Sequence, residues 1–223
     1  MAFENLHEAA RRGAAETITA LLGTDGSKSH PHASFHLLPR GRETARDMAD
    51  AVHFFAKLHG QRPGVIDLAQ ERPAHDEARE WLEAAAEGFA AERAYLLRVV
   101  VAVGPLPGTP GQAESEAAVT GQRHAVEMLA RSERNGCALG AALALALDWR
   151  VVRGVIDAAA QRFGAALIPP ALPSQRQTLA VAAKAGSPAI ERAMVFGTQQ
   201  LLAQHHGLWD LLEARAGARN GLY

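Results

Sequence analysis

The sequence has little of what marks secreted or membrane-spanning proteins. Its one cysteine, Cys137, excludes an internal disulfide, so nothing indicates an oxidising compartment. The longest run without a polar residue, 137–147, has eleven residues, well short of the ~20 that a helix needs to cross a membrane. Residues 1–12 contain Glu4 and Glu8 where a secretion signal has a basic start and then an apolar stretch. We therefore expect a soluble, cytoplasmic protein with no membrane partner.

An excess of either charge sign is also absent. The 23 Lys and Arg residues nearly cancel the 24 Asp and Glu residues, and the two signs are interspersed along the sequence. This balance argues against a general phosphate-binding surface, and no RNP-like motif, zinc-finger spacing or basic helix with interleaved aromatics is present. Motifs for phosphate loops, dinucleotide folds, serine-nucleophile elbows and HExxH zinc sites are missing as well. Nucleic acid is therefore not an expected partner, and no sequence motif indicates a particular enzymatic reaction.

What the sequence does contain is helical periodicity. Hydrophobic residues, chiefly Ala and Leu, make up 48% of the chain and aromatics 5%, which favours closely packed helices. Apolar residues recur every three or four positions, and no segment alternates over a useful length. The expected helices span 3–22, 43–59, 63–70, 76–103, 112–134, 136–163, 174–185 and 187–216.

The arrangement of these helices follows from their connections. A tight turn at Asn135-Gly136 makes helices 112–134 and 136–163 antiparallel neighbours. The second of these is apolar all round its cylinder, so it should be buried on all sides. We predict an all-α fold, an antiparallel helical bundle with a buried central helix. Residues 1–223 are expected to form a single helical domain.

Two segments rich in glycine and proline interrupt the helices. Residues 23–41 are too broken for regular structure and are predicted to form a long surface loop with at most one short turn. Residues 104–111 hold three prolines and three glycines, which no helix continues through. We expect an ordered connection there instead of a domain linker, because the helices on either side each have an apolar face that needs a partner.

Two ionisable residues interrupt apolar stripes. Glu92 lies on the stripe of helix 76–103, where a carboxylate is costly unless it is paired. An ion pair with Arg150 or Arg153 is one explanation. His205 completes the stripe of the last helix and is expected to point inward. A lone histidine on such a face is usually a satisfied core residue. A shared ligand pocket is favoured only if His205, Glu92 and the stripe of Glu116 on helix 112–134 converge.

A second pair of candidates lies on helix 112–134. Glu116 and His124 share a stripe with Glu127, beside small residues that let another helix approach closely. Carboxylates and imidazoles at helical spacing inside a bundle are used by carboxylate-bridged metal sites, usually as Glu-x-x-His. Here the order is reversed and no second copy exists, so a solvated face is the simpler interpretation. Catalytic residues, metal ligands and cofactors stay unassigned. The candidate ligand-binding residues are Glu92, Glu116, His124 and His205.

Two further features have simple structural explanations. His30, His32 and His36 lie within seven residues, but no carboxylate or thiolate completes a metal site there. Cys137 begins the apolar run of the central helix, so a buried, inert thiol is favoured over a catalytic one.

Several stretches of the sequence carry a resemblance to a known family. They are LHGQRPGVID at 58–67, VGPLP at 103–107, GQAESE at 111–116 and GQRH at 121–124. The chain resembles, over most of its length, an uncharacterised family of helical proteins from sphingomonad-type bacteria. The resemblance implies a bacterial protein, no known activity and no functional residue.

Two hypotheses from different classes follow. The first is a non-catalytic helical-bundle protein that binds a small-molecule ligand or a protein partner. A homodimer is one form that this hypothesis allows. The second is a metal-dependent enzyme of ferritin-like or haem-oxygenase-like architecture, which is an analogy of fold class only. Enzymatic activity is therefore left open.

Overall fold

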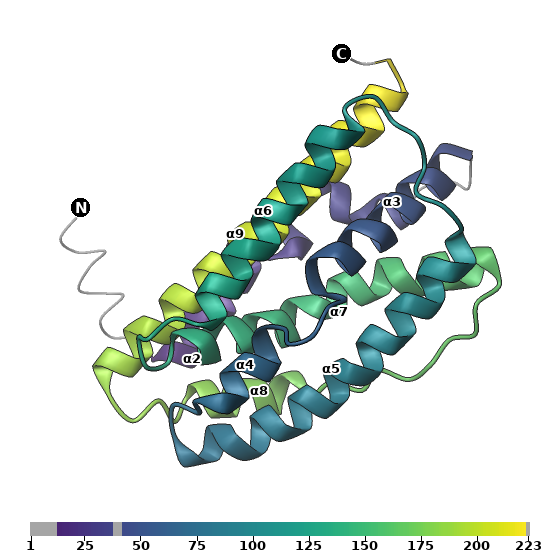
Figure 1. Ribbon diagram of the computed structural model, residues 1–223. Helices are drawn as coiled ribbons and strands as arrows, with labels where there is room; N and C mark the ends of the chain where they lie inside the picture. The colour runs from purple at the N-terminus through teal and green to yellow at the C-terminus, as the bar shows by residue number, and fades with distance from the viewer. Residues whose placement is uncertain (1–12, 38–41, 222–223) are drawn as a thin grey trace.

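The protein, described by a computed structural model over residues 13–37 and 42–221, is helical throughout these ranges and contains no strand there (Figure 1). None of the helices in these ranges combines the length and apolar character needed to cross a membrane. The α-helices are α2 (Ala14–Thr24), α3 (Arg42–His59), α4 (Val65–Glu71), α5 (Asp76–Val103), α6 (Gln112–Ala130), α7 (Cys137–Phe163), α8 (Gln175–Ala182) and α9 (Pro188–Arg219). Two 3-10 helices are η1 (Ser27–Ser29) and η2 (Pro31–Leu37). The predicted all-α fold is confirmed.

Helix α7 is the central element of the bundle. Residues 139–149 are all buried, and α7 packs against each of the other α-helices (Figure 1). Burial of each leucine or tryptophan on this helix contributes on the order of 2 kcal/mol to folding. The predicted buried central helix is confirmed, and two of its charged residues, Asp148 and Arg153, lie in the core of the bundle.

Helices α7 and α9 approach each other through glycine. A methyl group added to Gly140 would lie 2.0 Å from the carbonyl oxygen of Met194, and one added to Gly197 would lie 2.0 Å from that of Cys137. Neither position therefore accepts a side chain unless the helices separate. This contact fixes the register of α9 against the central helix.

Local signals set most helix boundaries. Ser174 and Ser187 each accept the backbone N–H three residues further on, as expected of N-caps. Helix α5 has the predicted bounds, whereas α6 ends four residues before the predicted Arg134. The predicted first helix, 3–22, lies outside the described residues up to position 12.

The segment between α2 and α3 differs from the predicted surface loop. It contains η1 and η2, and the side chains of Ser27 and His30 are buried. Ser27 is held inward because its backbone N–H and hydroxyl donate to the carboxylate of Asp148 on α7, at 2.8 and 2.5 Å. The surface-loop prediction was wrong here, since the partner lies 121 residues away in sequence.

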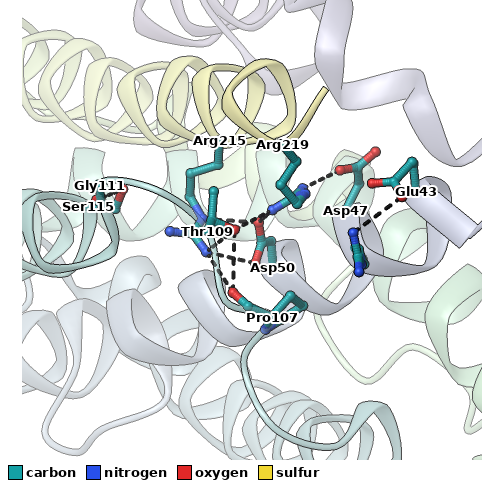
Figure 2. A network of polar contacts seen from close by, with 10 residues as sticks. Glu43, Asp47, Asp50, Pro107, Thr109, Gly111, Ser115, Arg215 and Arg219 are labelled. Atoms are coloured by element: carbon teal, nitrogen blue, oxygen red, sulfur yellow. Dashed lines mark hydrogen bonds and ion pairs between the residues drawn. The ribbon is translucent and has the colours of Figure 1, made fainter. Parts of the chain in front are cut away.

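The connection 104–111 is tied to the bundle by a charged cluster (Figure 2). Arg215 on α9 donates to both oxygens of Asp50 on α3, at 3.0 and 3.1 Å. It also donates to the carbonyl of Pro107 and the hydroxyl of Thr109, at 3.2 Å each. Arg219 forms ion pairs with Asp47 and Asp50. We call this group, Asp47, Asp50, Thr109, Arg215 and Arg219, the Arg215 cluster.

Candidate functional site

Four buried side chains from different parts of the sequence form one hydrogen-bonded network. We call Ser27, Asp148, His205 and His59 the histidine network. The Ser27 hydroxyl donates to Asp148 Oδ2 at 2.5 Å, and His205 Nδ1 lies 2.6 Å from the same oxygen. His205 Nε2 lies 2.8 Å from Nε2 of His59. None of the four residues is more than 5% exposed, so the network runs through the core.

Aromatic rings enclose the two imidazoles. The ring of Phe55 lies 5.8 Å from that of His205, and the rings of Phe89 and Trp149 lie 6.3 and 5.9 Å from that of His59. Burial in this wall lowers the pKa of His59 well below its ordinary value, and His205 and the charge of Arg93 lower it further. His59 is therefore neutral at neutral pH.

The carboxyl of Asp148 is ionised despite its burial. Burial raises the pKa of this group, but the hydrogen bonds and charge interaction from His205 and the two hydrogen bonds from Ser27 outweigh it. The pKa consequently lies below the ordinary value for aspartate. Asp148 acts in the network only as a hydrogen-bond acceptor.

His59 also lines a cavity of about 140 Å³, which we call the Arg93 cavity. Its walls come from the end of α3, the loop that follows, α4, α5 and α6. Leu58, Val65, Leu68, Phe89 and Val126 supply the apolar part of the lining. The cavity therefore lies directly beside one end of the histidine network.

Arg93 is the most buried charge in this lining, at 4% exposed. Its Nη2 donates to Asp67 at 2.6 Å, its Nε donates to the carbonyl of His59 at 3.1 Å, and the guanidinium stacks on Phe89 at 4.6 Å. Its Nη1 is buried and has no hydrogen-bond partner among the described residues. An unpaired N–H of a buried charged group costs on the order of 1–3 kcal/mol. Gly64 leaves room for this guanidinium, since a methyl group there would lie 2.5 Å from Nη2.

The cavity carries an excess of positive charge. Three arginines line it, Arg62, Arg93 and Arg123, against one carboxylate in the lining, Glu127. Outside the lining, Asp67 forms ion pairs with Arg93 at 2.6 Å and Arg62 at 3.3 Å, so it balances one of the three charges. Glu127 is already paired with Arg131, which lies 3.2 Å away. Low-dielectric walls strengthen the potential of such a group of charges. The cavity thus favours an anion.

Glu92 lies on the other side of Trp149 and has a full set of partners. Arg153 donates to both of its oxygens, at 2.8 and 2.7 Å, and the indole N–H of Trp149 and the backbone N–H of Ala171 donate at 3.1 and 2.9 Å. Of the two ion pairs considered from the sequence, the one with Arg153 is confirmed. This carboxylate joins α5 and α7 to the segment that precedes α8.

The four predicted site residues fall into two separate groups. His205 belongs to the histidine network, and Glu92 is joined to it through Trp149, which packs against His59. Glu116 instead pairs with Lys57 at 2.7 Å, half exposed, and His124 is exposed. The small residues beside them on α6 are exposed too, and a methyl group on Gly121 would meet nothing within 4 Å. The close helix approach expected at this stripe was wrong, because α6 turns that face to solvent.

One trio of potential metal ligands comes together within the described ranges. The ligand atoms of His30, His206 and Asp210 all lie within 4.8 Å of one another. However, His30 Nδ1 accepts the backbone N–H of His32, so in the neutral ring the proton sits on Nε2 and is donated to Asp210 at 3.0 Å. A metal ion would need that nitrogen without its proton. The hydrogen bonds therefore favour a His–Asp pair, and we assign no metal here.

A larger surface groove lies between α5 and α8. It has a volume of about 470 Å³ and is lined by alanine, valine and proline together with exposed charged side chains such as Glu77 and Lys184. None of the ionisable groups in this lining is buried. We consequently take the Arg93 cavity and the histidine network as the candidate site.

Most residues of this site, among them His59, Arg93 and Ser27, were not singled out from the sequence. His59 and Arg93 lie on predicted helices, and Ser27 lies in the predicted loop. His59 had one usable signal, because it falls on the apolar face of helix 43–59 directly before a glycine stop. Arg93 is one of several arginines on exposed and buried helix faces, and no local pattern distinguishes it.

Fold and site together define a class of protein. This is an all-helical bundle whose core holds a network of histidines beside a cationic cavity. The chain belongs to a family of unknown function (DUF6975), whose family model matches residues 22–220. The match includes every residue of the candidate site, and it confirms the expectation of an uncharacterised family. No curated protein and no solved structure matches the chain.

Proposed function

We propose that the protein binds a small anionic molecule in the Arg93 cavity. The observation that carries this proposal is the guanidinium of Arg93, which is buried in the cavity wall and keeps one nitrogen without a partner. Burying a charge is costly, so it is retained where it is paired or used. An anion in the cavity would supply the missing acceptor.

Arginine geometry supports an oxygen anion. Asp67 takes one edge of the Arg93 guanidinium through Nη2, and the carbonyl of His59 takes Nε. Nη1 is left for a ligand oxygen, and carboxylates and phosphates accept charge-assisted hydrogen bonds from such groups. Arg62, whose side chain is 66% exposed, and Arg123 extend the positive charge toward solvent.

The size of the cavity limits the ligand. A volume of about 140 Å³ is well below the roughly 300–1,000 Å³ of pockets that hold drug-sized ligands. This suits phosphate, sulfate or a short carboxylate, or the charged end of a longer molecule. Apolar side chains on the remaining walls would contact the uncharged part of such a ligand.

Titration calorimetry with phosphate, sulfate and acetate tests the proposal. We expect at least one of the three anions to bind the wild-type protein at concentrations up to about 10 mM. Arg93→Gln should weaken binding by about 10- to 100-fold, since it removes a charged donor. Arg93→Lys keeps the charge but not the planar guanidinium, so its anion affinity should lie between those of the wild-type protein and Arg93→Gln.

Arg98→Gln is the matched control. Arg98 lies on the same helix, is exposed and does not line the cavity, so its replacement should leave affinity unchanged. Thermal melts of each variant separate lost binding from lost folding. The proposal is wrong if none of the three anions binds, or if Arg93→Gln and Arg98→Gln bind equally well.

The metal-dependent enzyme remains an alternative hypothesis. Glu116 and His124 stay predictions as ligand-binding residues, although both lie on the exposed face of α6. Metal analysis of protein purified without an affinity tag, together with a visible spectrum, tests this alternative. Stoichiometric metal would favour it over simple anion binding.

Several broader expectations also stay predictions. They are one cooperative domain over the whole chain, a bacterial source of sphingomonad type, a cytoplasmic location, a homodimer in one version and no nucleic-acid partner. Limited proteolysis tests the first, because two separately folded fragments divided at 104–111 would contradict a single domain.

A further inference from the structure

The direction of the hydrogen bonds in the histidine network can be deduced from its fixed end. Asp148 Oδ1 accepts the backbone N–H of Ser27 at 2.8 Å, and this donor cannot be reversed. Oδ2 accepts the Ser27 hydroxyl and faces His205 Nδ1 at 2.6 Å. Since an ionised carboxylate only accepts, His205 carries a proton on Nδ1.

The proton on His205 in turn determines the state of His59. At about pH 8, above the ordinary pKa of histidine, an imidazole has one N–H and one lone pair, so His205 Nε2 is an acceptor. It lies 2.8 Å from His59 Nε2, which therefore carries the proton between them. His59 is neutral as well, because burial disfavours its charged form. The remaining nitrogen, His59 Nδ1, is left with a lone pair.

His59 lines the Arg93 cavity, and within the described part of the chain its side chain has no hydrogen bond except the one to His205. Its Nδ1 is not among the fully buried atoms without a partner, so a ligand in the cavity can reach the lone pair. The cavity therefore presents cationic donors from Arg93 and its neighbours together with one acceptor. A ligand that satisfies both has oxygens that accept and a hydrogen that donates.

We propose that the Arg93 cavity selects an oxyanion that also donates a hydrogen bond, as a phosphate group with a remaining O–H does, over an aprotic anion such as sulfate. This inference rests on the proposed function of anion binding. Facing a lone pair, a sulfate oxygen would place one acceptor against another, which leaves both unpaired and disfavours binding. In this account His59 contacts the ligand, while His205, Asp148 and Ser27 are positioning residues that set its proton.

Phosphate and sulfate form a closely matched pair for the test. At about pH 8, above the ordinary pKa of histidine, phosphate is mainly a dianion with one O–H, and sulfate is a dianion of similar size with none. Titration calorimetry of the wild-type protein should give at least about a tenfold preference for phosphate. Histidine ¹⁵N NMR should show the proton of His59 on Nε2.

Asp148→Asn provides a sharper test because it should reverse the direction of the hydrogen bonds from residue 148 through His205 to His59. The side-chain oxygen of the amide keeps the Ser27 backbone N–H, so the amide nitrogen faces His205 Nδ1 and donates to it. His205 then carries its proton on Nε2, and His59 accepts there and carries its own on Nδ1. The phosphate preference should disappear or turn into a sulfate preference, and the NMR tautomer of His59 should change.

Asp210→Asn is the control, since Asp210 pairs with His30 outside the network. It should change neither the affinity ratio nor the His59 tautomer. Equal affinity of the wild-type protein for both anions, or a wild-type His59 proton on Nδ1, would overturn this inference and leave anion binding intact. If neither phosphate nor sulfate binds, this inference fails, and the proposed function fails with it unless acetate binds. If Asp148→Asn does not fold, the phosphate-to-sulfate affinity ratio and the His59 tautomer of the wild-type protein decide the test.

Discussion

The Arg215 cluster and the Arg93 cavity are both built from buried arginines, but their charges are balanced differently. In the cluster, Arg215 and Arg219 meet two carboxylates, those of Asp47 and Asp50, and the bonded groups tie α3, α9 and the connection 104–111 together (Figure 2). In the cavity, three arginines line the wall, two of them share the single carboxylate of Asp67, and the carboxylate in the lining, Glu127, is paired with Arg131. A balanced group holds the fold together, and an unbalanced group beside a cavity is available for a ligand.

An unpartnered nitrogen alone does not distinguish the two regions. Arg215 Nη1 and Arg219 Nε are buried without a partner, as Arg93 Nη1 is. What sets Arg93 apart is its place in a cavity wall with excess positive charge and a neutral imidazole. The comparison therefore predicts different outcomes for substitutions in the two regions, stability in one and affinity in the other.

The largest effect is expected for Asp50→Asn in the Arg215 cluster. Removing one partner of a buried ion pair leaves an uncompensated charge, so we expect a loss of about 3–5 kcal/mol in the free energy of unfolding. Anion affinity should stay unchanged. Urea denaturation measures the first and calorimetry the second. A loss below about 1 kcal/mol would show that the cluster contributes little to stability.

Glu92→Gln should have the next largest effect. The carboxylate accepts from Arg153, Trp149 and Ala171, and Arg153 keeps a second partner in Asp157 at 2.8 Å. We expect a loss of about 2–3 kcal/mol in the free energy of unfolding, with anion binding retained. Loss of binding at unchanged stability would instead make Glu92 part of the ligand site.

Acid should destabilise the protein through His59. The pKa of His59 is lowered in the folded state, chiefly by burial, so below the unfolded value of 6.5 the unfolded chain binds a proton that the folded chain does not. This contribution is fully present above that pH and is lost by up to about 1.4 kcal/mol per pH unit as the pH falls. Urea denaturation between about pH 7.5 and 5 should show a shallower slope for His59→Gln.

Exposed His124 gives the control for that measurement. His124→Gln should leave the pH slope of the wild-type protein unaltered, because the side chain is exposed. An identical slope for the wild-type protein and His59→Gln would mean that His59 is protonated as readily in the folded state as in the unfolded chain.

The smallest effect is expected for Arg123→Gln at the edge of the cavity. Arg123 is half-buried and donates to Gln61, so its charge is partly screened by solvent. We expect anion affinity to fall about two- to fivefold and the free energy of unfolding to change by less than about 0.5 kcal/mol. No change in affinity would place the bound anion away from the α6 wall.

Much of the fold could be predicted because helix signals are local. The caps at Ser174 and Ser187, the glycine that follows α7 and the all-round apolar character of that helix can each be read within a few residues. The inward position of His205 follows from the same periodicity. These features depend on the 3.6-residue repeat and not on the rest of the chain.

The site could not be predicted in the same way because its contacts are long-range. Ser27 is 121 residues from Asp148, and His59 is 146 residues from His205. Periodicity states that a residue faces inward without stating what it meets there. The prediction for the stripe of Glu116 was wrong because small residues permit a close helix contact without requiring one. Helix α6 makes its helix contacts with another face.

Nitrogen-detected NMR of the Arg93 guanidinium during a phosphate titration tests the central claim most directly. If the anion binds at Nη1, the side-chain signals of Arg93 should shift in a saturable manner, while those of Arg215 in the balanced cluster stay unchanged. Resolved Arg93 signals that do not move at about 10 mM phosphate, sulfate or acetate would contradict the account.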